Sequence, residues 1–385
     1  MPRFNGNIRS KLPNTGTTIF TTMSKMANDY NAINLSQGFP DFPCSEELTA
    51  LVYAYMKAGE NQYAPMQGVI QLREKLSEKI KVAYNAEFDP VSEINITAGA
   101  TQALYAAITA VVREGDEVIV FTPAYDCYVP AITLAGGVPV FVRMDPPDFK
   151  VNWEDVKKLV NQRTRMIIIN TPHNPSATVL TKQDMDELDF ITKDSDIIIL
   201  SDEVYEHIIF DGAEHQSILK YPSLAERSFV VFSFGKTLHV TGWKMGYCVA
   251  PENLMAEFRK VHQFEVFTVN RPIQMAIADY LDNKDAYLSL SKFYQEKRDL
   301  FVKSLEQSRF KIIPCQGTYF QLAEYSEISD EADIDFVQTL TKEHGVAAIP
   351  ISVFYSRQSK MNVIRFCFAK ENETLERAAE ILCKI

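Results

Sequence analysis

The feature that most constrains the fold is a series of short, almost wholly apolar runs between residues 92 and 250. They are Val118–Phe121, Val138–Val142, Met166–Asn170, Ile197–Ser201, Phe229–Phe232 and Tyr247–Ala250. Amphipathic stretches such as Trp153–Asn161 and Lys182–Lys193 lie between several of them. Apolar strands that alternate with helices are typical of a parallel sheet covered on both faces. The sequence therefore predicts an α/β fold with a mostly parallel sheet sandwiched by helices, which binds its ligand at the carboxyl ends of the strands.

The flanking segments predict smaller units. Residues 1–45 are rich in Gly, Pro, Asn and Thr and are interpreted as an arm or loop. Helical patterns occupy Glu46–Lys57, Val69–Tyr84 and, as one long helix, Ile273–Leu305. After them come strand-like Thr318–Leu322, a helix near Asp335–Glu343, the stretch Val346–Ile349, a strand at Val363–Phe368 and a terminal helix from Asn372. We expect an N-terminal arm (1–45) that belongs to the small domain, a large domain (46–280) and a small C-terminal α+β domain (281–385).

Charge and cysteine content narrow the possible partners and compartments. The 385 residues carry 39 Lys and Arg against 50 Asp and Glu, a net charge of −11. Such a surface repels phosphate backbones, so we expect no nucleic-acid partner and no membrane surface. The six cysteines form no CxxC pair, which fits free thiols in a reducing compartment. No apolar run approaches the ~20 residues of a membrane span, and the N-terminus lacks a secretory pattern. We expect a cytoplasmic protein.

A candidate anion site lies at Asn95–Gly115. A strand-like start leads through the small residues Ala98–Thr101 into an amphipathic helix that stops at Gly115. Small residues at a helix N-terminus let a phosphate approach the free backbone N–H groups, and the helix dipole favours that phosphate. The alternative interpretation is a small-residue turn before a core helix.

The run IIILSDEVYEHI places Asp202 at the end of a buried strand, with Tyr205 three residues later. Asp202 is either a helix cap or a fixed negative charge at the ligand edge of the sheet, where it would pair with a cationic ring nitrogen. Glu203 and His207 have the four-residue spacing of metal ligands on a helix, but no third His or Cys lies nearby. No metal site is predicted.

The run FVVFSFGKTLHVTGWKMGY places Lys236 directly after another buried strand, beside Gly235 and near Ser233. A lone lysine is usually a solvated charge. A lysine held among cations and apolar walls instead has a depressed pKa and suits Schiff-base chemistry. A nucleotide P-loop is excluded, because Val230 stands where that motif needs glycine.

Two further polar side chains follow or interrupt apolar strands. Asn174, in the NTPHNPSA loop, either donates a hydrogen bond to a ligand or closes an Asx turn. Arg365, in the apolar strand NVIRFCF, needs a partner, which is either a structural carboxylate or the carboxylate of a ligand.

Taken together, these motifs resemble the class I/II aminotransferases of the fold type I pyridoxal-phosphate (PLP) enzymes. The resemblance extends over nearly the whole chain, with the motifs in the family's order. The motifs closest to the methionine/kynurenine aminotransferase branch are SQGFPDF, NQYAPMQG, GATQAL, NTPHNPSA, SDEVYEH, SFGKTLHVTGWKMGY and IPISVFYS.

The resemblance implies PLP as cofactor and a role for each matching residue. Lys236 should bind PLP covalently and later move a proton, and Asp202 should pair with the ring nitrogen. Tyr205 and Asn174 should hydrogen-bond the phenolic oxygen, and Tyr125 should stack on the ring. The groups expected at the phosphate are the backbone of Ala100 and Thr101, the side chains of Ser233 and Lys244, and Tyr63 of a neighbouring subunit. The protein would then be a homodimer with shared sites.

The resemblance also implies the substrates, an amino acid and a 2-oxo acid. Arg365 should hold the α-carboxylate, helped by the backbone of Gly38 and Asn174. The donor is expected to be apolar or aromatic, such as methionine, an aromatic amino acid, glutamine or kynurenine, because Tyr125, Phe39 and Phe354 suggest an apolar pocket. The amino group would move to a 2-oxo acid by a ping-pong mechanism.

Two departures and two alternatives accompany this prediction. Lys244 replaces the arginine of many relatives, as it does in the methionine/kynurenine-like branch, and Arg271 stands where a small or neutral residue is expected. The alternatives are a cysteine-S-conjugate β-lyase on the same scaffold and a non-catalytic PLP-binding regulator. The resemblance begins within the first forty or so residues, which leaves no room for the regulator's DNA-binding module.

Overall fold

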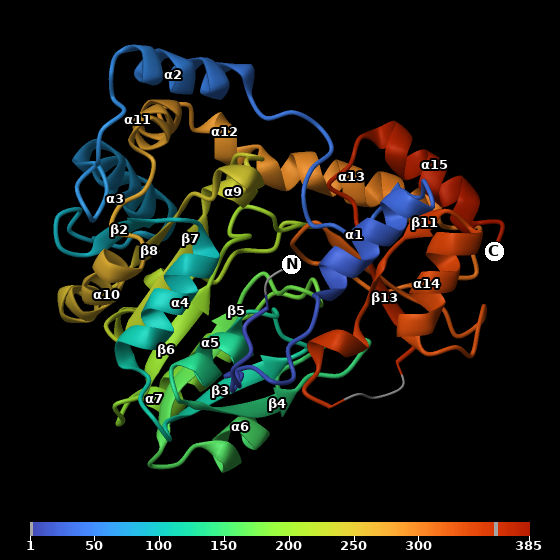
Figure 1. The fold of residues 1–385 in the computed structure, drawn as a ribbon, viewed down its shortest axis with the longest axis horizontal. Coiled ribbons are helices and arrows are strands. Elements are labelled where there is room, and N and C mark those ends of the chain that lie inside the picture. Colours follow the sequence, from blue (N-terminus) through green and yellow to red (C-terminus); the bar gives the residue numbers. More distant parts are fainter. Residues whose placement is uncertain (1–2, 358–360) are drawn as a thin grey trace.

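The computed structural model describes residues 3–357 and 361–385. A seven-stranded sheet with the order β2-β8-β7-β6-β5-β3-β4 forms its larger part (Figure 1). Its strands are β2 (Ile94–Thr97), β3 (Glu117–Thr122), β4 (Val138–Arg143), β5 (Thr164–Asn170), β6 (Ile198–Asp202), β7 (Ser228–Ser233) and β8 (Gly246–Val249). Every pairing is parallel except those that β8 makes with β2 and β7. The predicted α/β fold with a mostly parallel sheet is confirmed.

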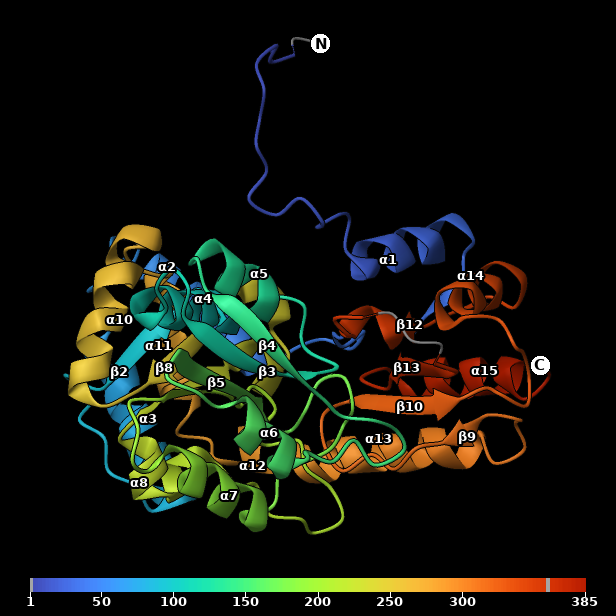
Figure 2. The same cartoon turned by 90° about the horizontal axis from the view of Figure 1, so that it is seen from below.

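Helices cover both faces of this sheet because its central strands are apolar on both sides. Every residue of β3, β6 and β7 is buried. One face carries α4 (Ala100–Val111), α5 (Tyr128–Leu134) and α10 (Glu252–Glu265), and the other carries α3 (Ile70–Tyr84), α6 (Trp153–Leu159), α7 (Lys182–Thr192) and α8 (Pro222–Ala225) (Figure 2). Alternate strand residues enter the two cores: Val231 packs with the α4 side, and Val230 with the α3 side.

A smaller sheet with the order β12-β13-β10-β9 lies beside the large one (Figure 1). It contains β9 (Lys311–Ile312), β10 (Phe320–Glu324), β12 (Ile349–Pro350) and β13 (Val363–Cys367), and the pairing of β1 (Ile33–Asn34) with β11 (Val346–Ala347) is separate. The helices around it are α13 (Leu290–Ser304), α14 (Asp333–Glu343) and α15 (Asn372–Leu382). The predicted division at residues 45 and 280 stays a prediction.

The expectation that residues 1–45 form only an arm or loop is wrong for α1 (Ile19–Asp29). Thr18 caps this helix by accepting a hydrogen bond from the backbone N–H of Thr21 at 3.2 Å. Met23 and Ala27, four residues apart, are buried where α1 packs against α14 and β11. Tertiary packing therefore stabilises a helix whose polar composition suggests a loop. From residue 3 the chain before α1 extends away from the body (Figure 2).

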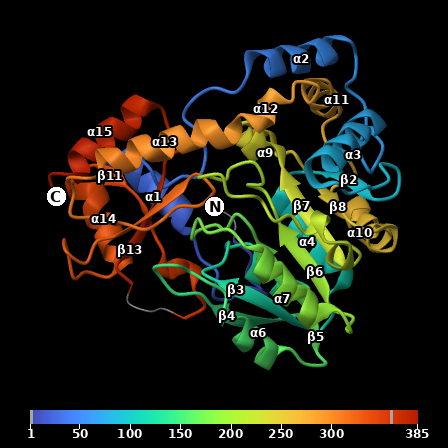
Figure 3. The same cartoon turned by 180° about the vertical axis from the view of Figure 1, so that it is seen from behind.

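The predicted long helix over Ile273–Leu305 is wrong in its continuity. The segment forms α11 (Arg271–Tyr280), α12 (Asp285–Leu288) and α13, because the polar stretch from Asp282 to Lys284 interrupts it. Figure 3 shows α12 and α13 leading from α11 towards α15. The helix α2 (Glu46–Lys57) packs against α11. None of the helices in the described residues combines the length and apolar character that a bilayer crossing requires.

Candidate active site

A cavity with about 730 Å³ of empty space, its open mouth included, lies where several strands of the large sheet end. Asn170, Asp202 and Ser233 are the last residues of β5, β6 and β7, and Asn170 is the register partner of Asp202. The cavity lining includes nine predicted site residues, namely Ala100, Thr101, Tyr125, Asn174, Asp202, Tyr205, Ser233, Lys236 and Lys244. The predicted sheet edge therefore collects most of the predicted residues in one place.

One wall of the cavity is suited to an anion. The helix α4 begins directly after Gly99, whose φ of +79° suits glycine, and no side chain caps its first turn. The side chain of Lys244 lies beside Gly99, because a Cβ built there would be 3.5 Å from the Cε of Lys244. The backbone of Ala100 and Thr101, a lysine and a serine thus surround a space that fits a phosphate.

Asp202 lies in the same cavity and is held by a tyrosine that the sequence analysis did not single out. The hydroxyl of Tyr128 donates to Oδ2 of Asp202 at 2.6 Å, and the N–H of Val204 donates to Oδ1 at 3.4 Å. Asp202 therefore does not cap a helix. Burial raises the pKa of its carboxyl to about 6, and the Tyr128 bond opposes part of that rise.

Lys236 lies on α9 (Phe234–Thr237), which begins as soon as β7 ends. Its Nζ donates to the hydroxyl of Tyr319 at 2.8 Å and to the carbonyl of Gly38 at 3.2 Å. Burial is the main reason why the pKa of Lys236 falls to about 8, and the charges of Arg365 and Lys244 lower it further. Lys236 is thus a partly buried, weakly basic lysine, as Schiff-base chemistry requires. Tyr319 is a second residue that the sequence analysis missed.

Arg365 enters the region from β13 and is joined to the cavity through Asn174. Its Nη1 donates to Oδ1 of Asn174 at 2.6 Å, and its Nη2 donates to the carbonyl of Ser36 at 3.4 Å. Its buried Nε has no partner among residues 3–357 and 361–385, and no carboxylate in that part pairs with the guanidinium. The guanidinium also lies 3.8 Å from the ring centroid of Phe320. This favours a ligand carboxylate over a structural one.

Asn174 does not close an Asx turn with its own side chain. Its backbone N–H donates instead to Oδ1 of Asn170 at 2.8 Å. No described residue accepts a hydrogen bond from its amide Nδ2, and Asn174 lines the cavity. The amide is therefore available to a ligand oxygen.

The tyrosines of the cavity are held in place by one another and by Thr101. The hydroxyls of Tyr125 and Thr101 lie 3.3 Å apart. The ring of Tyr205 stands edge-on to that of Tyr319, with centroids 5.1 Å apart. Burial raises the pKa values of Tyr125 and Tyr205, so both hydroxyls stay protonated and can donate to a ligand.

Comparison with known proteins identifies the family. A family model described as "Aminotransferase class I and II" matches residues 30–382. A methionine aminotransferase of Escherichia coli (strain K12) is 52% identical, with 97% of each chain covered, and a kynurenine–oxoglutarate transaminase of Dictyostelium discoideum is 34% identical, with 96% and 94% covered. The chain belongs to the class I and II aminotransferases. It is a transaminase, and the predicted family and enzyme class are confirmed.

The likeness extends to three dimensions. A solved Escherichia coli structure, whose title reports a methionine aminotransferase function, has a TM-score of 0.97 with this chain at 52% identity. It covers 98% of this chain and 100% of its own. Class I and II aminotransferases generally depend on PLP.

Four residues that the resemblance singled out, Gly38, Tyr63, Arg271 and Arg365, lie outside the cavity lining. Gly38 and Arg365 reach it only through their bonds to Lys236 and Asn174. Tyr63 is 78% exposed, packs edge-on against Phe267 and is not one of the residues that line the cavity. Arg271, at the start of α11, donates to Glu60 at 2.5 Å and does not line the cavity. Its place is therefore at an ion pair near the surface.

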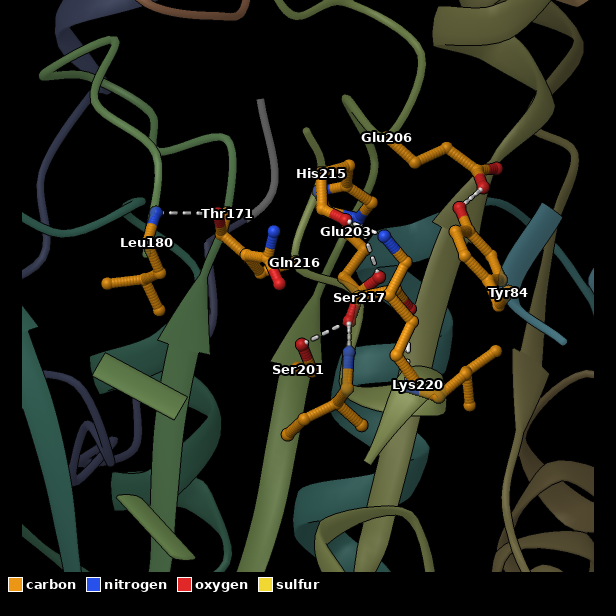
Figure 4. Close-up of polar contacts among 12 residues, drawn as sticks. Tyr84, Thr171, Leu180, Ser201, Glu203, Glu206, His215, Gln216, Ser217 and Lys220 are labelled. Carbon is orange, nitrogen blue, oxygen red and sulfur yellow. Dashed lines mark hydrogen bonds and ion pairs between the residues drawn. The ribbon is translucent and has the colours of Figure 1, made fainter. Parts of the chain in front are cut away.

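The segment that carries Asp202 and Tyr205 is fixed by two buried glutamates (Figure 4). Glu203 accepts from Ser201 at 2.8 Å and from the backbone N–H of Ile218 at 3.0 Å, and it lies 2.8 Å from Nε2 of His215. Glu203 and His207 do not lie on one face of a helix, since this segment is a series of turns.

Glu206 anchors the other end of the segment. It pairs with Lys79 at 2.6 Å, accepts from Tyr84 and Tyr247, and lies 3.5 Å from His207. Burial on its own would raise the pKa of Glu206, but Lys79 and these neighbours hold it down at about 2. These glutamates carry no signal in the sequence, because a pair of buried ions looks like two surface charges until the fold brings them together.

Replacing Glu206 should therefore destabilise the chain strongly. Glu206→Ala leaves the ammonium of Lys79 buried without its partner, and we expect a loss of about 3–5 kcal/mol in the free energy of unfolding. In the wild type, the stability that the charged carboxyl of Glu206 adds is complete above its pKa in the unfolded chain, about 4.3. This stability is lost as the pH falls towards its pKa in the folded protein, about 2. Urea unfolding measures the change.

The matched control is Glu214→Ala. Glu214 pairs with Lys220 at 2.7 Å but its side chain is 75% exposed, so the expected loss is under about 1 kcal/mol. Equal losses for the two variants would contradict the anchoring role of Glu206.

Proposed function

We propose that this transaminase uses PLP to move the amino group of an apolar or aromatic amino acid to a 2-oxo acid. The observation that carries the proposal is a partly buried lysine and a buried carboxylate in one cavity, each bonded to neutral partners. Relatives named methionine aminotransferase and kynurenine–oxoglutarate transaminase support the donor class. A cytoplasmic location and the absence of nucleic-acid partners stay predictions.

The residues around the cavity fit PLP. The first turn of α4, with Ser233 and Lys244, would hold the phosphate, and Asp202 would hold a proton on the ring nitrogen. Tyr205 and the Nδ2 of Asn174 would donate to the phenolic oxygen. Tyr125 lines the same cavity and would cover the ring. When bound, PLP supplies the electron sink for negative charge that develops at the substrate Cα.

The chain's own groups then perform binding and proton transfer. Arg365 binds the α-carboxylate of the amino acid, because its unpaired Nε and its fork of N–H donors suit a carboxylate. The Nζ of Lys236 takes the proton from the substrate Cα and would later release it at another position of the bound substrate and cofactor. A pKa near 8 allows both transfers close to neutral pH. Asp202 keeps the ring-nitrogen proton in place throughout.

The surroundings of Arg365 support an apolar donor. Rings of Phe20, Phe320 and Phe354 lie within 3.8–5.6 Å of its guanidinium carbon. The cavity lining contains no arginine that would receive a second substrate carboxylate, and Arg271 is engaged by Glu60. Methionine or an aromatic amino acid suits this environment better than aspartate does.

We expect the purified protein to carry PLP on Lys236. Borohydride should fix the cofactor there, and peptide mass mapping should find the label on Lys236. Lys236→Ala should still bind PLP without a covalent bond and should lose turnover, because the proton carrier is gone. A label on any other lysine would contradict the proposal.

Asp202→Asn should retain PLP yet transaminate poorly. A neutral amide does not hold the ring-nitrogen proton, and if the ion pair supplies about 4 kcal/mol, kcat falls about a thousandfold. Steady-state kinetics and absorbance of bound PLP measure the two effects. Near-normal kcat would mean that another group supports the ring nitrogen.

Arg365→Lys should depress kcat/KM for every amino donor by a similar factor. An ammonium does not reproduce the guanidinium fork, so a loss of about 1.5–3 kcal/mol is expected, which corresponds to about 10- to 150-fold. A panel of methionine, phenylalanine, glutamine and aspartate measures it.

In the wild type, methionine should be a better donor than aspartate, and Arg271→Ala is the matched control. If aspartate proves the better donor and Arg271→Ala removes that preference, the apolar pocket is wrong and Arg271 is a substrate ligand.

The proposal includes a homodimer in which Tyr63 is donated to the partner's phosphate site. Support comes from the exposure of Tyr63 (78%), Phe264 (86%) and Phe267 (45%) on one chain, since such large apolar groups favour a covering surface. Sedimentation should show a dimer, and Tyr63→Phe should weaken PLP retention more than donor preference. A fully active monomer would contradict this.

A further inference from the structure

Tyr319 and the carbonyl of Gly38 surround the side-chain nitrogen of Lys236. The hydroxyl of Tyr319 lies 2.8 Å from Nζ and 2.5 Å from the carbonyl oxygen of Gly38, and that oxygen lies 3.2 Å from Nζ. The three atoms therefore form a closed triangle of hydrogen bonds. Tyr319 is fully buried, just before β10, and neither the sequence motifs nor the proposed mechanism gives it a role.

The directions of these hydrogen bonds follow from the chemistry of the groups. A carbonyl oxygen only accepts, so the hydroxyl hydrogen of Tyr319 points to Gly38. The oxygen of Tyr319 is then left to accept an N–H of Lys236. A neutral amine has two N–H groups and one lone pair. When both N–H groups are committed to Tyr319 and Gly38, tetrahedral geometry directs the lone pair away from both.

We propose that Tyr319 and the carbonyl of Gly38 hold the free amine of Lys236 and orient its lone pair for proton transfer at the substrate Cα. The inference rests on the proposed function, which makes Lys236 the proton carrier. It assigns Tyr319 a positioning role that acts through Nζ. Correct orientation of a base is worth a large factor in rate, because a small displacement lengthens the proton path.

Contacts with neighbouring residues hold Tyr319 in place. Its ring packs edge-on against Tyr205 and tilted against Tyr294, with centroids 5.1 and 5.7 Å away. Its carbonyl accepts from the N–H of Phe368 at 3.0 Å. Two residues earlier, a Cβ on Gly317 would come within 2.8 Å of Pro172, so the backbone there lies close against the loop that carries Asn174.

Gly38 is fixed from the other side. A Cβ on Gly38 would lie 2.8 Å from the ring of Phe320, so only glycine lets this loop approach β10 so closely. The next carbonyl, that of Phe39, accepts from Nζ of Lys370 at 2.8 Å. The acceptor oxygen of Gly38 is therefore as well defined as the hydroxyl of Tyr319.

The groups around Nζ predict how the pKa of Lys236 changes when Tyr319 is replaced. The titratable groups that face Nζ are Asp202, Tyr205, Lys244, Tyr319, Arg365 and Cys367. Replacing Tyr319 by phenylalanine leaves the charges among them unchanged. It removes the hydrogen bond that Tyr319 donates to Gly38 and the one that it accepts from Nζ. That bond favours the ammonium over the amine, so its loss should lower the pKa of Lys236 further.

The experiment uses the full chain with and without PLP, and compares Tyr319→Phe with Tyr294→Phe. Tyr294 is the matched control, because it is buried in the same cluster and its hydroxyl has no partner in the described residues. Without PLP, Lys236 is labelled with acetic anhydride over a pH series and quantified by mass spectrometry. Tyr319→Phe should shift the labelling midpoint down by about 0.4–1 pH unit, the equivalent of one hydrogen bond.

With PLP bound, kcat of Tyr319→Phe should fall by about 10- to 100-fold while KM changes little, because orientation of the base is lost and binding is not. The isotope effect with α-deuterated methionine should rise, since proton transfer becomes slower relative to other steps. Tyr294→Phe should leave the midpoint, kcat and isotope effect unchanged.

An unchanged midpoint and isotope effect in Tyr319→Phe would overturn the proposal, as would equal effects in the two variants. If Tyr319→Phe does not fold, 3-fluorotyrosine at position 319 serves instead. It weakens the hydrogen bond that the hydroxyl accepts from Nζ without loss of the hydroxyl, and should move the midpoint in the same direction. Failure of the borohydride label to reach Lys236 in the wild type would instead remove the proposed function, so the two failures are distinguishable.

Discussion

Asp202 is buried and Lys236 is partly buried at the same sheet edge, and the two groups bond to neutral partners rather than to each other. Burying an ion costs several kcal/mol unless another group compensates it. Here Tyr128 holds the carboxylate, and Tyr319 with Gly38 holds the amine. Burial shifts both pKa values towards neutrality, to about 6 and about 8. Both groups line the same cavity, as a ring that contacts both would require.

The rest of the fold holds Asp202 and Lys236 at separate positions on this sheet edge. Parallel strands end together, so that β6 supplies Asp202 and β7 leads directly to Lys236. Helices on both faces keep water from the sheet. The smaller sheet adds Arg365 from β13 and Tyr319 from the start of β10, while the loop at Gly38 closes against both. The buried glutamates on either side of Tyr205 keep the turn after β6 rigid (Figure 4).

Sequence alone predicts the parts that local patterns encode. Continuous apolar runs mark the strands, and the position of Asp202 or Lys236 at a strand end follows from the run itself. It misses α1, whose helix depends on packing against α14, and the break between α11 and α13. It also misses Tyr128 and Tyr319, because both act through hydrogen bonds to residues far along the chain. Such contacts exist only after folding, and a tyrosine in an apolar stretch looks like any core residue.

In the proposed reaction, the site takes an amino group from an apolar amino acid and keeps it until a 2-oxo acid arrives. The most direct test mixes the PLP-loaded protein with excess L-methionine and no acceptor, and measures 2-oxo acid and ammonia together. The account predicts a single equivalent of 2-oxo acid for each Lys236, no ammonia, and renewed reaction once an acceptor is added. Continuous release of ammonia without an acceptor, as a lyase would give, would contradict it.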